Sequence, residues 1–309
     1  MLVSSSSSGR AQVKFDQTYG LQEEPPELRG LLFQQNQDGS VRLLRRSGET
    51  DPDTPPDIPE EALVGDRVFI SVDGISQDWR RHREQISEWF HAGSDYATSV
   101  KGPVIGIHEG EGPSALHDVL RVLKDTLLTK GLQSGLLKLR QARERAYAND
   151  PSVKTIYDQL KQSLRVGRQV TLMVHSGGAA QAALALALLG AESGGRWRPR
   201  IAESVRVLGT APAAHRRDFE WAGVRGEEIM VTGSRRDPVY GFYSHHVDPK
   251  RPWSLLPFLG GGALTSLKFA FHSGPFHQGE YIFSANKGPE GHAIQQFLDG
   301  GQGSDRELP

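Results

Sequence analysis

Short apolar runs alternate with helix-like segments along most of the chain. The runs at 67–72 and 103–107 predict buried strands, because they are short, continuous and bounded by polar or turn-forming residues. The expected strands are 67–72, 103–107, 169–174, 204–208 and 228–232, and the expected helices are 77–91, 114–130 and 179–190. Such alternation is typical of the α/β class, in which a mostly parallel sheet has helices on both faces.

The first part of the chain has a different pattern. Residues 1–28 are polar and include a serine run, so we expect a flexible arm without a function of its own. Two apolar runs follow at 30–35 and 40–44, and they flank Asp38-Gly39. An Asp-Gly pair between two such runs predicts a β-hairpin.

The remainder is expected to form a single domain, residues 29–309, with two insertions. Residues 131–167 are helical by period, and Asp150-Pro151 predicts a break and restart of the helix. Residues 242–276 are rich in Pro, Gly and aromatic side chains and follow no regular period. A last strand is expected at 280–284.

The most informative motif is V-H-S-G-G at residues 174–178. An apolar strand ends there and a helix of small residues begins, so Ser176 occupies a sharp turn from strand to helix. Such a turn presents a serine hydroxyl as a nucleophile. It also directs the backbone N–H of the next residue, Gly177, toward the position where an oxyanion forms. The motif differs from the G-x-S-x-G pattern because Val174 occupies the place of the first glycine.

Two later residues, Asp237 and His292, complete a triad with Ser176 in the order Ser, Asp, His. Asp237 follows an expected strand within a short turn that contains glycine, and His292 lies in a loop before the last expected helix, 293–298. In this order and in these contexts the chain resembles the α/β-hydrolase superfamily, over roughly residues 65–300. The resemblance implies that Ser176 attacks a carbonyl carbon, His292 transfers the proton and Asp237 orients the imidazole.

The resemblance also implies a second oxyanion donor, in a loop after an early strand. Here that loop is D-G-I-S at 73–76, and the N–H of Ile75 is the best candidate to act together with that of Gly177. Asp73 departs from the expected pattern. A carboxylate beside a developing negative charge weakens transition-state stabilisation unless it turns away or is tied to a cation or to backbone donors.

Other residues compete for these roles. Asp218 follows the preceding strand and is the rival acid, while His272 and His277 lie late enough in the chain to replace the expected histidine. Ser176 has an alternative role at the start of a helix in a Gly-rich anion-binding turn, although no G-x-G-x-x-G or P-loop pattern is present. His175 is expected to face away from the reaction and to support the turn through a hydrogen bond.

Composition narrows the function classes. The chain contains no cysteine, which excludes disulfides, thiolate metal ligands and a cysteine nucleophile. Two clusters, H-H-V-D at 245–248 and H-E-G-E at 108–111, lack the spacing of a preformed metal site, so we expect no metal and no cofactor. The formal net charge of -1 gives no overall attraction to nucleic acid, and the basic cluster at 196–200 is expected to be a solvated loop.

The pattern of apolar residues does not indicate secretion or membrane insertion. The N-terminal residues lack the apolar core of a secretory signal, and no apolar run approaches the roughly 18 residues of a membrane span. We therefore expect a cytoplasmic protein without a transmembrane segment. The sequence leaves the oligomeric state open.

Two hypotheses of function follow from the sequence. The first is a serine hydrolase that cleaves a carboxylic ester without a cofactor; thioester cleavage, amide cleavage and acyl transfer use the same triad. The substrate is expected to be a small ester with an apolar part, because the apolar residues of 242–276 suggest a lid or an acyl pocket. The second hypothesis is a non-catalytic member of the fold that binds a ligand or a protein, and Val174 and Asp73 motivate it.

Overall fold

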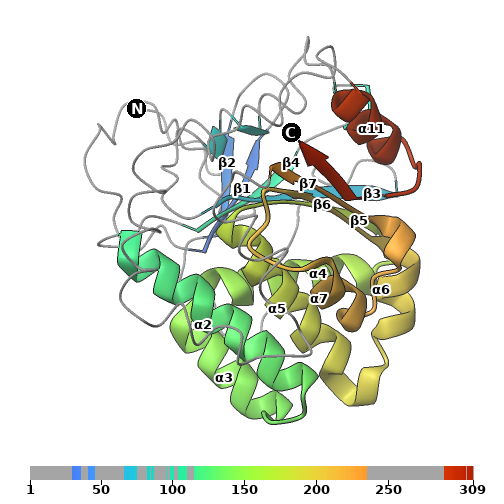
Figure 1. Cartoon of the computed structure of the whole chain (residues 1–309). Coiled ribbons are helices and arrows are strands. Elements are labelled where there is room, and N and C mark those ends of the chain that lie inside the picture. Colours follow the sequence, from blue (N-terminus) through green and yellow to red (C-terminus); the bar gives the residue numbers. More distant parts are fainter. Residues whose placement is uncertain are drawn as a thin grey trace, which may run out of the picture.

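The structure of the chain is a computed structural model, shown in Figure 1. It describes residues 30–35, 41–45, 66–74, 82–83, 85–86, 96, 98–100, 104–109, 115–234, 289–303 and 305–308. Several predicted features lie outside these residues: Asp237, Ile75, His272, His277, the arm 1–28, the strand 280–284 and the segment 242–276. The single-domain organisation also stays a prediction.

The described strands form one mixed sheet that is mostly parallel. The strands are β1 (Leu31–Gln35), β2 (Val41–Arg45), β3 (Arg67–Val72), β4 (Val104–His108), β5 (Gln169–His175), β6 (Val205–Thr210), β7 (Ile229–Ser234) and β8 (Asp305–Leu308). Their order across the sheet is β2-β1-β4-β3-β5-β6-β7-β8. β1 runs antiparallel to β2, as the predicted hairpin requires, and also antiparallel to β4. The pairs from β4 to β8 across the sheet are parallel.

Helices cover both faces of this sheet. They are α2 (Ala115–Gln133), α3 (Leu139–Asn149), α4 (Pro151–Arg165), α5 (Gly177–Ala191), α6 (Arg198–Ser204), α7 (Arg216–Ala222) and α11 (Pro289–Leu298), with short 3-10 helices η4 (Glu192–Gly195) and η5 (Gly226–Glu228). In Figure 1 the helices α2 to α7 lie on one side of the sheet and α11 lies on the other. This is the α/β arrangement that the alternating pattern predicts.

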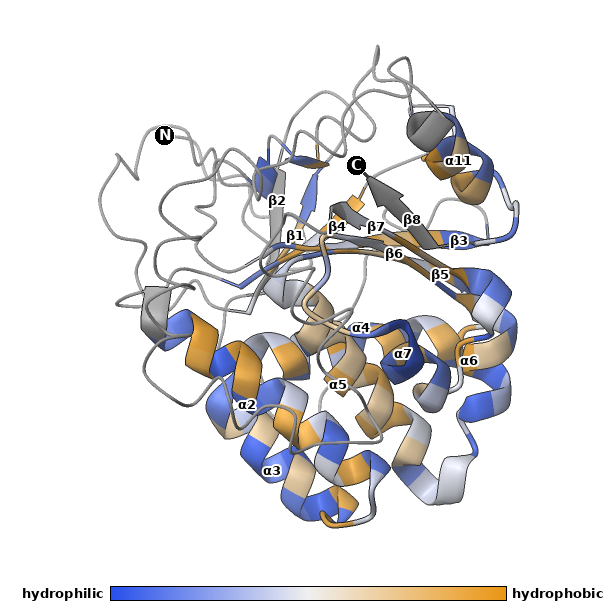
Figure 2. Cartoon of the chain, viewed as in Figure 1, coloured by the Kyte–Doolittle hydropathy of each residue, from blue (hydrophilic) through white to orange (hydrophobic). Residues whose placement is uncertain are grey.

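Alternation along each central strand explains why both faces are covered. In β3, Val68, Ile70 and Val72 enter the larger apolar core beneath α2 to α7, whereas Phe69 enters the smaller core on the α11 side. Successive side chains of a strand point to opposite faces, so a strand that is apolar at every position needs cover on both. Figure 2 shows the apolar residues concentrated in the central strands and in α5.

α5 is the central helix of the larger core. Residues 177–190 of this helix are all buried, and α5 contacts α2, α4 and α7. Its alanines and glycines allow these helices to approach closely. A Cβ on Gly190, for example, would lie 2.4 Å from the carbonyl oxygen of Ala222 in α7. The small residues of 179–190 therefore reflect close packing on all sides of the helix.

The crossover from β4 to β5 runs through α2, α3 and α4. Asp150 ends α3 and caps α4, because its side chain accepts a hydrogen bond of 2.9 Å from the N–H of Ser152, and Pro151 occupies the first turn. The predicted break and restart is thus confirmed. α4 packs against α5 and β5, and its buried residues Ile156 and Leu160 belong to the larger core.

Three local predictions need correction. The basic cluster expected as a loop includes the start of α6, because the buried residues Trp197 and Ile201 anchor a helical turn while the arginines stay exposed. α11 begins at Pro289, a residue whose fixed φ suits the first helical position, so His292 lies inside the helix rather than in the loop before it. The strand β8 was not expected.

The described helices were compared with the length and hydropathy of a membrane-spanning helix. None of them combines the length and the hydropathy that crossing a bilayer requires. α5 is the most apolar of the long helices, yet its apolar surface is covered by neighbouring helices and by the sheet.

Candidate active site

Ser176 connects the end of β5 to the start of α5, and its backbone is strained. The residue has φ of 46° and ψ of -122°, a combination that residues other than glycine rarely adopt. Such a conformation costs on the order of 1–3 kcal/mol and persists only where the surrounding structure imposes it. A strained turn of this kind is the geometry that presents a serine nucleophile at the end of a parallel strand.

Backbone hydrogen bonds from the neighbouring strand impose this conformation. The N–H of Ser176 donates to the carbonyl of Thr210 at 3.2 Å, and the carbonyl of Ser176 accepts from Ala179 at 3.2 Å and from Ala213 at 2.8 Å. Thr210 ends β6 and Ala213 lies just beyond it. The Ser176 side chain makes no capping hydrogen bond to α5, so the serine is not a conventional N-cap.

Two glycines allow the turn to lie directly against the end of β3. A Cβ on Gly178 would lie 2.1 Å from the carbonyl oxygen of Asp73, and a Cβ on Gly74 would lie 2.7 Å from the Cβ of Ser176. Contacts this short are not found between real atoms, so both positions require glycine. The Asp73-Gly74 backbone therefore touches the serine turn, as an oxyanion loop after β3 must.

Val174, the departure from the glycine pattern, fits its surroundings without distortion. Its side chain is buried in the larger core. In the register of the sheet Val174 lies opposite Gly209 of β6 and Val72 of β3, and paired residues of parallel strands point to the same face. Val174 therefore packs as an ordinary core residue of β5.

The carboxylate of Asp73 has a backbone N–H and a histidine as partners, which the nearby oxyanion position requires. Its Oδ1 accepts a hydrogen bond of 2.6 Å from the N–H of Glu109, and its Oδ2 contacts Nδ1 of His108. Burial alone raises the pKa of Asp73, but His108, His82 and these hydrogen bonds outweigh that effect and hold the pKa below its ordinary value. The carboxylate is thus compensated by its own partners.

His82 is the third member of this buried group. It lies in a helical segment of which residues 82–83 and 85–86 are described, and its ring packs edge-on against Phe33. Burial lowers the pKa of His82 to about 4, so the ring is neutral at pH 7. Nothing in the sequence distinguishes His82, because it lies among charged residues in a segment that reads as an ordinary helix surface.

His175 supports the serine turn, as the sequence predicts. Its Nδ1 lies 3.0 Å from the carbonyl oxygen of Thr210 and 3.2 Å from the hydroxyl of the same residue. These contacts hold the end of β5 against the end of β6. The ring is buried and its Cδ2 lies beside Gly74.

The rival acid, Asp218, is occupied elsewhere. It lies in the first turn of α7 and forms a capping box with His215. Its carboxylate also accepts hydrogen bonds from Lys130 and, at 2.7 Å, from Gln133 of α2. The contacts with Lys130 and Gln133 join α7 to α2, and the capping box stabilises the first turn of α7.

The remaining predicted residues lie partly outside the described chain. Asp237 and Ile75 belong to residues that the structure does not describe, so their roles stay predictions. His292 has an exposed side chain in the first part of α11. Gly177 is the first residue of α5, where backbone N–H groups have no partner within the helix.

Comparisons with known proteins do not name a family. No protein-family model matches the chain, and no curated protein matches it. The case for a function therefore rests on the geometry of the serine turn and of the residues around it.

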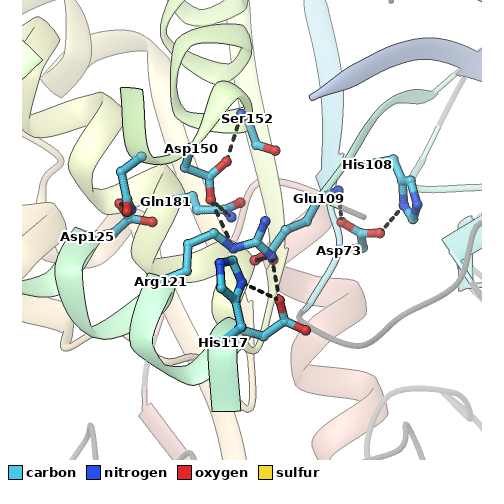
Figure 3. A network of polar contacts seen from close by, with 11 residues as sticks. Asp73, His108, Glu109, His117, Arg121, Asp125, Asp150, Ser152 and Gln181 are labelled. Carbon is cyan, nitrogen blue, oxygen red and sulfur yellow. Dashed lines mark hydrogen bonds and ion pairs between the residues drawn. The ribbon is translucent and has the colours of Figure 1, made fainter. Parts of the chain in front are cut away.

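A second buried network begins at Glu109 and extends under the site. Figure 3 shows the side chain of Glu109 pointing toward Arg121, on the opposite side from Asp73. Arg121 donates to Glu109 at 2.6 Å and to Asp118 at 3.3 Å, and it lies 3.6 Å from Asp150. Gln181 of α5 donates to Asp150 at 2.6 Å. One guanidinium thus serves several carboxyl groups from different elements.

The carboxyl groups around Arg121 outnumber this cation, and two of them, Glu109 and Asp125, have raised pKa values. Burial raises the pKa of Glu109 well above its ordinary value, although Arg121 opposes the shift. Burial, together with the nearby charge of Asp150, raises the pKa of Asp125 in the same way. Asp125 accepts a hydrogen bond of 3.1 Å from Asn149, while its second oxygen has no hydrogen-bond partner among the described residues.

Replacement of Asp125 with Asn is expected to stabilise the protein at neutral and higher pH. A carboxyl group whose pKa is raised by folding favours the folded state at low pH. That contribution is lost as the pH rises from the ordinary value of about 4 through the raised value. Asp125→Asn keeps the acceptor for Asn149 and removes the charge, so we expect a gain on the order of 1 kcal/mol at pH 8 and a smaller one at pH 5. Denaturant unfolding at the two pH values measures this.

Glu144→Gln is the matched control for this prediction. Glu144 forms an exposed pair with Arg140 at 2.8 Å, and such pairs contribute little. The control should change the free energy of unfolding by less than about 0.5 kcal/mol at both pH values. A gain for Asp125→Asn that does not grow with pH contradicts the assignment.

Proposed function

We propose that this protein is a serine hydrolase with an α/β-hydrolase fold, and that it cleaves a carboxylic ester through an acyl-enzyme intermediate. The observation that carries the proposal is the strained backbone of Ser176 between β5 and α5, with φ of 46°. A helix-capping or anion-binding turn has no need of this conformation, whereas a nucleophile turn does.

The contact between the serine turn and the end of β3 supports the same proposal. In this fold the oxyanion is bound by the N–H after the nucleophile and by an N–H of the loop that follows the third strand. Gly74 of that loop lies against Ser176 here, and the N–H of Ile75 is the proposed second donor beside that of Gly177.

The proposed reaction uses three side chains in the usual roles. Ser176 Oγ attacks the ester carbonyl while His292 accepts its proton, and the oxyanion is stabilised by the two backbone donors. His292 then protonates the leaving alcohol, and water releases the acid by the reverse sequence. Asp237 orients the imidazole and stabilises its charged form. No metal or cofactor takes part in these steps.

The contacts of Asp218 favour Asp237 as the acid. Asp218 is held by Lys130 and Gln133 and by the capping box of α7, so its oxygens are committed to joining two helices. An acid that orients a catalytic histidine needs an oxygen available for the imidazole N–H.

A non-catalytic binding protein remains the alternative hypothesis, but its two motivating features have local explanations. The Val174 side chain is buried in the larger core, and Ser176 keeps its strained backbone close to it. Asp73 is compensated by Glu109 and His108. Neither departure therefore removes the geometry that a nucleophile needs.

A fluorophosphonate probe is expected to label the wild-type protein and to leave Ser176→Ala unlabelled. The probe reacts with a serine that an adjacent base activates, so labelling reports the nucleophile without knowledge of the substrate. Circular dichroism and thermal unfolding establish that the variant is folded. Folded wild-type protein that does not react at all would exclude the enzyme and favour the binding protein.

Asp237→Asn is expected to impair catalysis, whereas Asp218→Asn is expected to impair stability. The first should lower kcat on a model ester by roughly 1,000-fold or more at unchanged stability, because the histidine loses its orienting partner. The second should lower the melting temperature, since Lys130 is left buried without its charge partner, while kcat stays within about tenfold at a temperature where the variant is folded. The reverse outcome would make Asp218 the acid.

Esters of increasing acyl length test the expected apolar part of the substrate. We propose an apolar acyl or alcohol group, because residues 242–276, which lie between the two proposed triad members, are rich in aromatic and aliphatic residues. Activity should rise from the acetyl ester toward medium chains. A steady fall in kcat/KM from acetyl upward contradicts it, and thioester and amide analogues in the same assay separate the reaction classes.

A further inference from the structure

Asp73, His82 and His108 bring three metal-ligating atoms together at the carboxyl ends of β3 and β4. One ligand atom from each residue lies within 4.8 Å of the other two, and the Nδ1 atoms of both histidines are close to Oδ2 of Asp73. All three side chains are fully buried. They come from the end of β3, a helical segment and the last position of β4, so the fold alone brings them together.

The geometry around His82 indicates that a cation belongs between these atoms. Its Nε2 lies 3.2 Å from the hydroxyl of Ser71, so the opposite nitrogen, Nδ1, points at Asp73. That Nδ1 is 3.3 Å from Oδ2 of Asp73 but makes no hydrogen bond to any of the described residues. A fully buried ring nitrogen without a hydrogen bond is costly, and a metal ion is a partner that would satisfy it.

The separation of the two atoms also suits a metal. Ligand atoms about 2.0–2.1 Å from a tetrahedral zinc ion lie about 3.3–3.4 Å from each other. The distance from His82 Nδ1 to Asp73 Oδ2, 3.3 Å, matches this value. His108 lies closer to Asp73 and must withdraw slightly to admit an ion.

Contacts to the outer atoms of the ligands complete the arrangement. Ser71 holds the far nitrogen of His82, and the N–H of Glu109 holds Oδ1 of Asp73. Metal ligands in proteins are typically fixed by such outer hydrogen bonds, which orient the ring and the carboxylate.

We propose that Asp73, His82 and His108 bind a divalent transition-metal ion of the zinc type, with a water molecule as a fourth ligand. Two imidazoles and one carboxylate suit zinc better than magnesium or calcium, which prefer oxygen ligands. One carboxylate leaves the occupied site with a single positive charge. The sequence predicted no metal because the spacing of the three ligands along the chain matches no recognisable metal-binding motif.

The bound ion has a structural role: it links three segments of the chain and takes no part in the hydrolysis. Asp73 precedes Gly74, which lies against the serine turn, so an ion held by Asp73 fixes that loop relative to β4 and to the segment that carries His82. The proposal does not depend on the proposed function, because metal binding is measured directly.

Cobalt(II) is the probe for the wild-type protein. After dialysis against a chelator, addition of Co²⁺ to the full chain should give visible absorption bands of a four-coordinate nitrogen and oxygen site, saturating at about one ion per chain, and Zn²⁺ should abolish them. Zinc at about 100 times its dissociation constant should raise the melting temperature by about 3 °C or more.

His82→Ala is the test variant and His117→Ala is its matched control. His117 lies in α2 with a side chain that is 49% exposed. Loss of His82 should weaken Co²⁺ binding by more than about 100-fold, beyond the effect of losing an outer contact, while His117→Ala should bind as the wild type does.

Absence of both the visible bands and the zinc-dependent rise in melting temperature in the wild-type protein would overturn the proposal. It would leave Asp73 and His108 as a buried hydrogen-bonded pair. Equal binding by His82→Ala and His117→Ala would overturn the assignment as well. Fluorophosphonate labelling of Ser176 is read separately, so failure of the metal site and failure of the hydrolase are distinguishable.

Discussion

The close approach of the first turn of α5 to the end of β3 is the constraint on which the site depends. Gly178 has no space for a Cβ because the carbonyl oxygen of Asp73 occupies it, and Gly74 has none because Ser176 does. With the two backbones in contact, the chain leaves β5 through a single residue. Ser176 absorbs the change of direction, which accounts for its positive φ. The strain of the serine is thus a consequence of packing.

Buried charge connects this contact to the rest of the molecule. Glu109 donates its backbone N–H to Asp73 and accepts from Arg121 through its side chain, so one residue joins the loop beside Ser176 to the network under α5. Isolated charges in such a place would be costly. Here several carboxyl groups share Arg121, and burial raises the pKa of Glu109 and of Asp125, which favours their neutral forms. The arrangement fixes the positions of β3, β4, α2 and α5 at the same point.

Most of the fold follows from local pattern, whereas the polar clusters do not. The strand 67–72 and the helix of small residues after Ser176 were predictable, because apolar periodicity and glycine content act within a few residues. The short helix α6 was missed because one buried tryptophan, Trp197, outweighs its polar neighbours. Asp73 and His108 meet because β3 and β4 are neighbours in the sheet, and His82 joins them from the segment between these two strands.

The two departures from the hydrolase pattern show why a motif mismatch is weak evidence against a nucleophile. The pattern has a glycine two residues before the serine, but Val174 at this place packs into the larger core and Ser176 still has the strained backbone. The pattern avoids a carboxylate near the oxyanion, but Glu109 and His108 engage the carboxylate of Asp73. In the second case the physical requirement is met by residues that the motif does not contain. What must be preserved is the conformation of the serine, and φ of 46° at Ser176 preserves it.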